Sequence, residues 1–523
     1  MQLIRHCFFG VLLLASLGTN AQQNLQFLNH WGNQESEAEI VRSDSTVHTS
    51  ARPMLEWKAA PRVKSKEFYA GSEYGSYSWF RRKLWHEHLV DIQRPDAEMP
   101  FHFTIDPLFR FEGGNDSEDT SDVFLRKNTR GFLVRGSIGQ QVTFESSFYE
   151  NQSFLPTYQR EFANRTGVIP GSGRHKVFQE TGFDYSMSSG LISYTPNTHF
   201  NFRFGHGKNF IGDGYRSLLL SDNAFNYPFF RSGITFGKGK FQYTSIWAWL
   251  QSVNRVPRSS TPEASFQRKA GSFHYLNWMP HRRLAIGLFE GVMWQRWDST
   301  GTTDFDANFV NPVIGANTLV HGLDDPQVNA IIGLNLKVLP LNWLQVYGQW
   351  MMDESSETGY QGGLRLLEPV GVEGLFLQAE WNSVAGQAYD NALPLQRFDH
   401  YNQPLAHPQG GGFREVLVKA NYRYKRMFTR VQYTNVRQEF DADGVQVGQN
   451  PVVADFTILP ATTRTIRYTS VEIGYLVNPA TNMHLALGMV NRDLESGSGT
   501  SDQSTRMVYL TWSTALRNIY YDF

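Results

Sequence analysis

Apolar and polar residues alternate with a period of two along most of the chain after Phe101. The alternation is clearest in residues 344–350, 375–382 and 416–425, where every second side chain is apolar or small and those between are mostly polar or charged. Successive side chains of an extended strand point to opposite faces. The pattern therefore predicts β-strands with one apolar face and one wet face.

We expect about 18 such strands, with boundaries good to a few residues. They lie near residues 101–111, 129–138, 141–150, 183–195, 200–206, 232–237, 241–251, 269–278, 284–296, 328–338, 342–352, 359–367, 374–383, 414–425, 427–437, 465–477, 483–491 and 505–515. The connections alternate between short ones, such as 139–140 and 339–341, and long ones, such as 151–182 and 297–327. Only 353–358 is of medium length.

This alternation of short and long connections is typical of bacterial outer-membrane barrels, which have short periplasmic turns and longer external loops. Strands of about 10 residues suit a tilted span of the bilayer. A closed sheet leaves no unpaired edge in lipid. The predicted fold class is therefore all-β, a transmembrane antiparallel up-and-down β-barrel of about 18 strands over residues 99–523. An even strand count places both termini at the periplasmic side.

The N-terminal residues have the features of an export signal. Arg5 and His6 precede the apolar stretch Phe8–Leu17, which is too short to span a bilayer, and Ala21 ends a small-x-small cleavage site. We therefore expect residues 1–21 to be a signal peptide.

Residues 22–98 are polar and irregular, and we interpret them as a small helical N-terminal segment on the periplasmic side. A helix is predicted near residues 78–92, with Ser78 as its cap. Trp85, Leu89 and Ile92 would lie on one face of this helix.

Composition and motifs exclude several other classes. Lys and Arg total 48 against 49 Asp and Glu, which argues against a nucleic-acid binder. The mean hydropathy of −0.40 leaves no long apolar run after the N-terminus, which excludes a helical membrane protein. Cys7, the only cysteine, lies in the signal segment, so disulfides and thiolate chemistry are excluded.

Residues 205–209 depart from a phosphate-binding loop, and residues 86–88 do not form a metalloprotease motif. We expect no cofactor, no metal and no enzyme activity, although a site assembled in space from distant residues leaves no motif.

One segment, Phe204–Ala224, stands apart because glycines and charged residues are interleaved along it. It is either an external loop with turn glycines or a segment folded into the lumen, where glycines allow close backbone approach. We favour the second reading, with a short helix at Tyr215–Leu220 and with each buried charge paired. The candidate plug or glycan contacts are His206, Lys208, Asp213, Tyr215, Arg216 and Asp222, together with Lys419 and Arg423 on the wet face of the strand at 414–425.

This segment also carries a family resemblance. GHGKNFIGDGYRSLLLSDNA (205–224), HTSARP (48–53), FRRKLWHEHL (80–89) before FTIDPLFRFE (103–112), and the ending NIYYDF (518–523) resemble the capsule-assembly Wzi family, and within it the gliding-motility RemB-like branch. The resemblance covers essentially the whole mature chain. It implies an outer-membrane barrel, a helical part at the periplasmic mouth, inward-folded plug segments and lectin-like contact with surface polysaccharide. The terminal Phe523 resembles the signal that barrel-insertion machinery reads.

We therefore expect an outer-membrane barrel that binds or organises surface polysaccharide in capsule or exopolysaccharide assembly, with a link to gliding motility. A diffusion porin or transporter, or an outer-membrane enzyme with a site on its loops, remains an alternative. Eighteen strands of about 10 residues use only about 180 positions of the chain. The residues left for loops and a plug are more than a plain porin requires, which favours a plugged barrel. Expected partners are surface polysaccharide, outer-membrane lipid and the insertion machinery, and not nucleic acid. Aromatic loop residues suit sugar rings, although packing between loops explains any single one better; they are Phe305, Phe309, Tyr389, Phe398, Tyr401 and Phe440.

Overall fold

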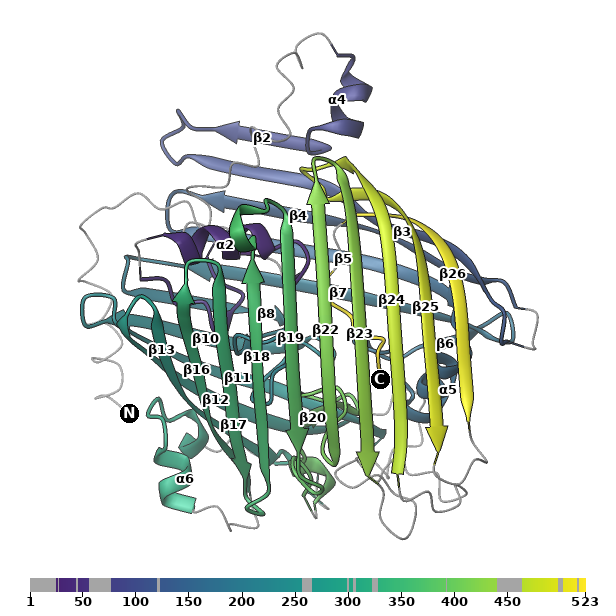
Figure 1. Cartoon of the computed structure of the whole chain (residues 1–523). Coiled ribbons are helices and arrows are strands. Elements are labelled where there is room, and N and C mark those ends of the chain that lie inside the picture. The colour runs from purple at the N-terminus through teal and green to yellow at the C-terminus, as the bar shows by residue number, and fades with distance from the viewer. Residues whose placement is uncertain are drawn as a thin grey trace.

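The computed structural model describes residues 25–523 except 27, 44–45, 56–76, 120–122, 256–265, 299–300, 304–306, 322–327, 392, 440–462, 497–501 and 515–516. Its main feature is a closed barrel of 18 antiparallel strands (Figure 1). The predicted signal peptide and two of the loop aromatics, Phe305 and Phe440, lie outside the described residues.

All the predicted wall strands are present. They are β3 (Phe101–Asp116), β4 (Leu125–Ile138), β5 (Val142–Phe154), β7 (Gly182–Tyr194), β8 (Phe200–Gly207), β10 (Tyr227–Phe236), β11 (Phe241–Arg255), β12 (Phe266–His281), β13 (Leu284–Gln295), β16 (Val328–Leu341), β17 (Leu344–Asp353), β18 (Thr358–Leu367), β19 (Leu375–Val384), β22 (Phe413–Tyr424), β23 (Met427–Glu439), β24 (Thr463–Asn478), β25 (Met483–Ser496) and β26 (Gln503–Ser513). Each pairs with the next wall strand along the chain, which confirms the fold class.

Smaller elements decorate this wall. The helices are α2 (Gln34–Arg42), α4 (Trp79–Trp85), α5 (Thr157–Thr166) and α6 (Ala316–His321), with single 3-10 turns η3 (Ala307–Val310), η4 (Pro369–Gly371) and η5 (Pro394–Gln396). The short strands are β1 (Ala51–Arg52) paired with β9 (Phe210–Ile211), β14 (Trp297–Asp298) with β15 (Gly301–Thr302), β20 (Asp399–His400) with β21 (Gln403–Pro404), β2 (Val90–Arg94) beside β3, and β6 (Lys176–Phe178) beside β7. None of the helices in the described ranges is long and apolar enough to cross a membrane.

The two ends of the barrel differ in their connections, as the sequence predicts. At one end, called the short-turn end, tight turns join pairs such as β4–β5 and β22–β23. At the other, the long-loop end, the loops include 155–181, 208–226 and 385–412. The ring closes where Met507–Ser513 of β26 pairs with Arg110–Asp116 of β3. Because β26 ends there, β2 pairs with the rest of the β3 edge at Phe101–Ile105 (Figure 1).

The register predicted for the wall strands is confirmed, with apolar side chains outside and polar ones inside. On β22, Val416 and Val418 are 47% and 45% exposed, whereas Glu415 and Lys419 are 1% and 2% exposed. The outer face is apolar toward the short-turn end, for example at Leu485 and Leu487 of β25 and at Val508, Leu510 and Trp512 of β26. Toward the long-loop end it becomes charged, with the ion pairs Arg467–Glu495 and Arg506–Asp493. An apolar outer band with a polar rim is the surface that a bilayer requires.

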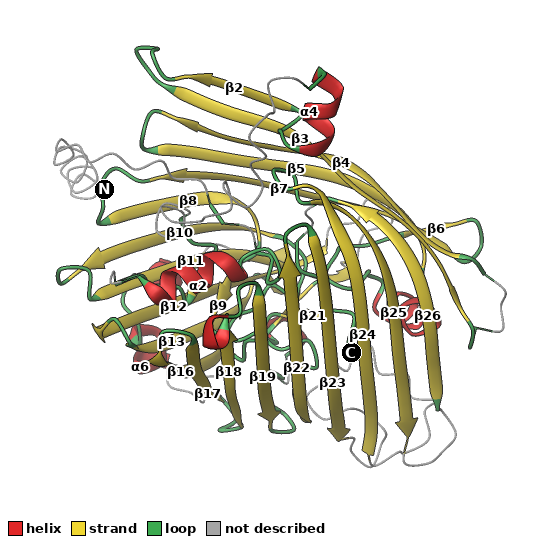
Figure 2. Cartoon of the chain, turned by 45° about the horizontal axis from the view of Figure 1, so that its top comes forward, coloured by secondary structure: helices red, strands yellow, loops and turns green. Residues whose placement is uncertain are grey.

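Three chain segments fill the lumen. The N-terminal segment (residues 25–55) enters at the short-turn end with α2, the inner loop (residues 207–224) comes from the long-loop end, and the C-terminal tail (residues 518–523) folds back inside from β26 (Figure 2). β1 of the first segment pairs with β9 of the second. Their apolar side chains pack with inward-facing wall residues in one large buried core.

One expectation about the segments at the barrel ends needs correction. The helix predicted at 78–92 ends at Trp85, and Val90–Arg94 forms β2 instead, because the free edge of β3 offers it hydrogen-bond partners. The described residues between 25 and 55 lie in the barrel mouth, at the short-turn end. The last strand, β26, stops at Ser513, and the tail that follows it turns into the lumen.

Candidate functional site

The inner loop is held in an irregular conformation by polar side chains of the wall. The helix predicted at Tyr215–Leu220 is wrong: the stretch forms bends. Glu380 of β19 accepts the backbone N–H groups of its first two residues at 2.8 and 3.2 Å, and Gln349 of β17 accepts that of Leu218 at 2.8 Å. These wall side chains satisfy buried backbone donors of the irregular stretch, which would otherwise lack partners.

Two glycines let this backbone approach the wall closely. Gly212 has a φ of +151°, a conformation that residues with a side chain rarely adopt. At Gly214, an added Cβ would lie 2.7 Å from a carboxylate oxygen of Glu380, which is closer than real Cβ contacts. These positions explain why the segment is rich in glycine.

Arg216 is the centre of a buried ionic cluster in the lumen. Its guanidinium donates to Glu415 of β22 at 3.1 Å and to Asp522 of the C-terminal tail at 2.6 Å, and all three side chains are almost fully buried. Glu415 also binds His407 at 2.8 Å. The cluster ties the inner loop, the wall, the 385–412 loop and the C-terminal tail together.

Asp213 joins the inner loop to the N-terminal segment and to strand β16 of the wall. It accepts hydrogen bonds from Ser50 at 2.7 Å and from Asn335 at 2.8 Å, and it pairs with Lys337 at 3.1 Å. Burial raises the pKa of the Asp213 carboxyl, but the attraction of Lys337 and these hydrogen bonds outweigh that effect and lower it to about 2. Asp213 is therefore ionised at neutral pH.

Lys208, near the start of the inner loop, and Asp222, near its end, lie close together. The Asp222 carboxylate accepts hydrogen bonds from Tyr520 at 2.6 Å and from Asn518 at 2.9 Å, both in the C-terminal tail. Lys208 donates to the backbone oxygens of Gly171 at 2.8 Å and of Asp222 at 3.0 Å. Burial lowers the pKa of Lys208 to about 8, although the nearby Asp222 partly opposes this shift. Lys208 thus fastens the 155–181 loop to the inner loop.

The remaining predicted site residues are dispersed. Lys419 points into the lumen, with its ammonium 3.4 Å from the ring centre of Tyr215 and 4.1 Å from that of Trp31. Such contacts favour a cation in a dry site. Arg423 is near the short-turn end and pairs with Glu35 of α2, away from the inner loop.

His206 is on β8 and is partly exposed, with its ring 5.9 Å from that of Phe225. Lys208, Asp213, Tyr215, Arg216, Asp222 and Lys419 are therefore buried in the lumen, whereas His206 and Arg423 lie apart from them.

Several residues that complete this network have no signal of their own in the sequence. Glu380 and Glu415 are on wet faces of predicted strands, so the alternation places them inside but does not name their partners. Asp522 and Tyr520 lie in a terminal segment interpreted as an insertion signal. Their role appears only once the tail is seen inside the barrel.

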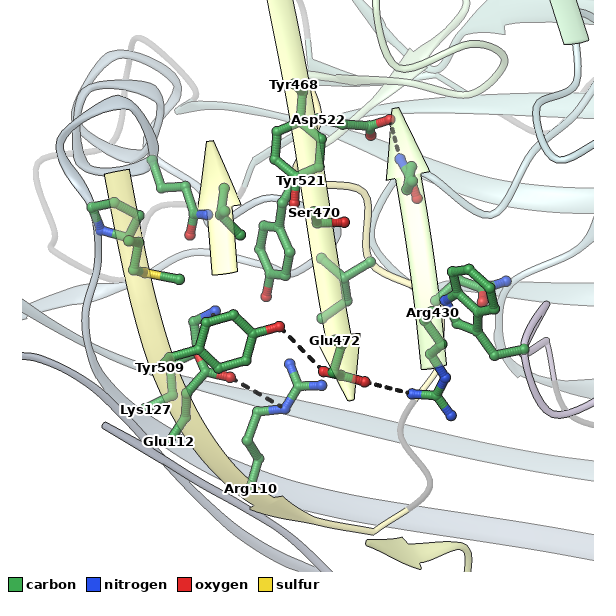
Figure 3. Close-up of a pocket in the computed structure, with 18 of the residues that line it drawn as sticks. Arg110, Glu112, Lys127, Arg430, Tyr468, Ser470, Glu472, Tyr509, Tyr521 and Asp522 are labelled. Atoms are coloured by element: carbon green, nitrogen blue, oxygen red, sulfur yellow. Dashed lines mark hydrogen bonds and ion pairs between the residues drawn. The ribbon is translucent and has the colours of Figure 1, made fainter. Parts of the chain in front are cut away.

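A cavity of about 210 Å³ remains between the plug and one side of the wall (Figure 3). Strands β3, β4 and β23–β26 form its outer side, and the C-terminal tail forms part of its inner side. Its charged and aromatic lining includes Arg110, Glu112, Lys127, Arg430, Tyr468, Glu472, Tyr509 and Tyr521 (Figure 3). Charged groups and aromatic rings thus face one cavity of modest size.

A second pocket, of about 90 Å³, lies between α5 and the 385–412 loop at the long-loop end, and we call it the outer pocket. Its lining combines two arginines, Arg165 and Arg397, with Asp390 and the rings of Phe162 and Tyr389. Arg397 pairs with Asp390.

Three of the four loop aromatics that the structure describes are buried in packing contacts rather than exposed to solvent. Tyr389 and Phe398 are 5% and 1% exposed, and their rings stack 5.9 Å apart. Phe309 stacks on Trp294 at 4.1 Å. Within the described part of the chain, no group of three or more His, Cys, Asp or Glu side chains is placed to hold a metal ion.

Comparisons with known proteins place the fold. No protein-family model matches the chain, and no curated protein sequence matches it. Among solved structures, the chain resembles Wzi of Escherichia coli, described as an outer-membrane protein involved in group 1 capsule assembly and as a carbohydrate-binding β-barrel. The TM-score is 0.54 and the identity is 13%, over 94% of this chain and 100% of that one.

It also matches OprD of Pseudomonas aeruginosa, with a TM-score of 0.44 and 13% identity over 80% of this chain and 96% of that one. The outer-membrane protein OpdK of the same organism gives a TM-score of 0.42 and 11% identity over 78% and 98%. At such identities a likeness concerns the fold alone: this chain has the architecture of an outer-membrane β-barrel like that of Wzi.

Proposed function

We propose that this protein is a plugged outer-membrane barrel that binds surface polysaccharide at its long-loop end. The observation that carries the proposal is the filling of the lumen by three segments fastened to the wall through Asp213, Arg216 and Asp222. A barrel blocked in this way is suited to present a binding surface rather than to pass solutes. The solved barrel with the same architecture is itself described as carbohydrate-binding.

The outer surface of the wall supports an outer-membrane location. The apolar outer face lies toward the short-turn end, and the charged rim lies toward the long-loop end. Bacterial barrels direct their longer loops to the outside. We therefore infer that the long loops face the exterior. The apolar band of the wall would be surrounded by outer-membrane lipid, into which the insertion machinery places the barrel.

The outer pocket is the proposed contact with polysaccharide. Sugar rings are bound by aromatic faces together with groups that donate and accept hydrogen bonds at their edges, and Phe162, Arg165 and Asp390 line this pocket. Arg165 is exposed on α5 and gives the pocket a cation for acidic sugars. This is a binding role and not an enzymatic one. A link to gliding motility rests on the sequence resemblance alone.

The test is binding of purified protein, folded in detergent, to an array of capsular and extracellular polysaccharides. Arg165→Ala should weaken binding of acidic glycans severalfold, whereas Asn164→Ala, on the neighbouring exposed position of the same helix, should not. Reconstituted protein should also show little steady conductance in planar bilayers. A large steady conductance without glycan binding would favour the porin alternative instead.

A further inference from the structure

The cavity in Figure 3 contains one more positive charge than its own carboxylates neutralise. Glu112 pairs with Lys127 at 3.1 Å, and Glu472 pairs with Arg430 at 2.9 Å (Figure 3). Arg110 of β3 is a further cation on this lining, and its closest approach to a carboxylate is 4.0 Å, to Glu112. Arg110 therefore shares the Glu112 carboxylate with Lys127, which lies closer to it.

The other charged groups on this lining are matched by residues behind it. Arg517 pairs with Glu145 at 2.9 Å, and Asp522 pairs with Arg216 at 2.6 Å. Among the described lining residues, Arg110 is thus the cation that lies farthest from a carboxylate, at 4.0 Å against 2.9–3.1 Å for Lys127, Arg430 and Arg517. A buried or half-buried cation without a full partner is costly unless an anion joins it.

The geometry of Arg110 suits such an anion. Its Nε is buried and has no hydrogen-bond partner among the described residues. Its guanidinium points into the space between Glu112, Glu472 and Tyr509 (Figure 3). The planar fork of an arginine binds a carboxylate through two parallel hydrogen bonds, which a lysine cannot reproduce.

The rest of the lining suits a ring that bears hydroxyl groups. Tyr468, Tyr509 and Tyr521 supply aromatic surface, and Gln432 and Ser470 supply polar groups at the edge. The volume of about 210 Å³ is below the ~300–1,000 Å³ of pockets for drug-sized ligands, so it accommodates one sugar-sized unit rather than a chain. One side of the cavity is formed by the C-terminal tail.

We propose that this cavity is a second binding site, distinct from the outer pocket, for one small organic carboxylate held by Arg110. A uronic acid unit of a polysaccharide and a free organic acid share this chemistry. This proposal is independent of the outer pocket: the cavity could bind a carboxylate even if the outer pocket binds no polysaccharide.

Titration calorimetry of the full-length protein folded in detergent tests the site with D-glucuronate, propionate and D-glucose as separate probes. Glucuronate should bind, glucose should bind at least about tenfold more weakly, and Arg110→Gln should weaken glucuronate binding about tenfold or more, because charge-assisted hydrogen bonds are lost. Arg110→Lys should restore part of the affinity. Binding of both acids assigns the site to carboxylates in general, and binding of glucuronate alone assigns it to a uronic acid unit.

Arg130→Gln is the matched control, because Arg130 lies beside Phe109 on the neighbouring strand and is exposed on the outer face. Folding of each variant is checked by its heat-modifiable mobility on gels. The proposal is overturned if glucose binds as tightly as glucuronate, if folded Arg110→Gln keeps the wild-type affinity, or if no probe binds. Polysaccharide binding through Arg165 should be unchanged in Arg110→Gln, which separates the two sites.

Discussion

Arg216 of the inner loop and Asp522 of the C-terminal tail form an ion pair of 2.6 Å in the middle of the lumen, although 306 positions separate them in the chain. Glu415 of the wall completes the cluster on the same guanidinium nitrogen. The pair is sealed from solvent, so each charge depends on the other for its compensation. It therefore links the stability of the plug to the position of the chain end.

Removing this arginine should loosen the plug. Arg216→Met leaves two buried carboxylates without their cation, and breaking a buried pair costs about 3–5 kcal/mol. We expect a rise in conductance in planar bilayers and cleavage of the tail by added protease. Arg467→Met is the control, because Arg467 and Glu495 form a half-exposed surface pair that is screened by solvent and contributes little to stability. An Arg216→Met barrel that stays closed and protected would contradict the role given to this cluster.

Deleting residues 518–523 should open the lumen without preventing assembly. The last strand ends at Ser513, and its pairing with β3 over Met507–Ser513 does not involve the tail. We expect normal amounts of the truncated protein in the outer membrane, with increased uptake of large antibiotics by the cells.

Truncation after Leu510 is the contrasting variant, because it also removes the three residues of β26 that pair with Arg110, Phe111 and Glu112. That protein should fail to fold. If loss of 518–523 alone abolishes insertion, the tail is a targeting signal as the sequence suggests, and its place in the lumen is secondary.

The wall was predictable because its signal is local. Alternation along β22 places Lys419 inside and Val418 outside from the sequence alone, since a strand has only two faces. The same reasoning located all the wall strands and the difference between their two ends.

The plug was predictable only in part, because its conformation depends on distant partners. The glycines of the inner loop indicated inward folding, but a helix at Tyr215–Leu220 was expected because the wall side chains that hold this stretch, such as Glu380, lie far from it in the sequence. Likewise, nothing near Asp522 in the sequence points to Arg216. Pairings across such separations follow from the closed barrel and not from any local pattern.

Gly214 should tolerate no side chain. In Gly214→Ala the new Cβ would lie 2.6 Å from the carbonyl oxygen of Arg216 and 2.7 Å from the carboxylate of Glu380. Overpacking of this kind costs about 1–3 kcal/mol. We expect a lower midpoint in the heat-modifiability curve, and Gly362→Ala on β18, where the added atom meets nothing within 4 Å, should leave it unchanged. Equal midpoints for the two variants would mean that the loop is free to move off the wall.

Acid should weaken the attachment of the inner loop through Asp213. The folded-state pKa of this carboxyl is lowered to about 2, below its ordinary value of 3.8. The stability that the Asp213 carboxylate contributes is therefore fully present above pH 3.8. It is lost as the pH falls through the folded-state pKa of about 2. The shift corresponds to about 2 kcal/mol. Between pH 5 and pH 2 the wild-type unfolding midpoint should fall more steeply than that of Asp213→Asn, which carries no titrating group there. Parallel curves would show that this carboxylate does not support the plug.

The outer face of β22 tests whether the wall is surrounded by lipid. Val418→Arg places a charge on the apolar band, where a cation near the bilayer midplane costs about 2–4 kcal/mol. Arg414 is already exposed on the same face, four positions closer to the long-loop end, where the surface is polar. We expect Val418→Arg to reduce the folded, membrane-inserted fraction in lipid vesicles and Arg414→Val to leave it unchanged. Both variants should fold equally well in detergent micelles, which adapt to a surface charge. If Val418→Arg inserts as efficiently as the wild type, this face of the barrel does not meet hydrocarbon, and the membrane location inferred from the wall is wrong.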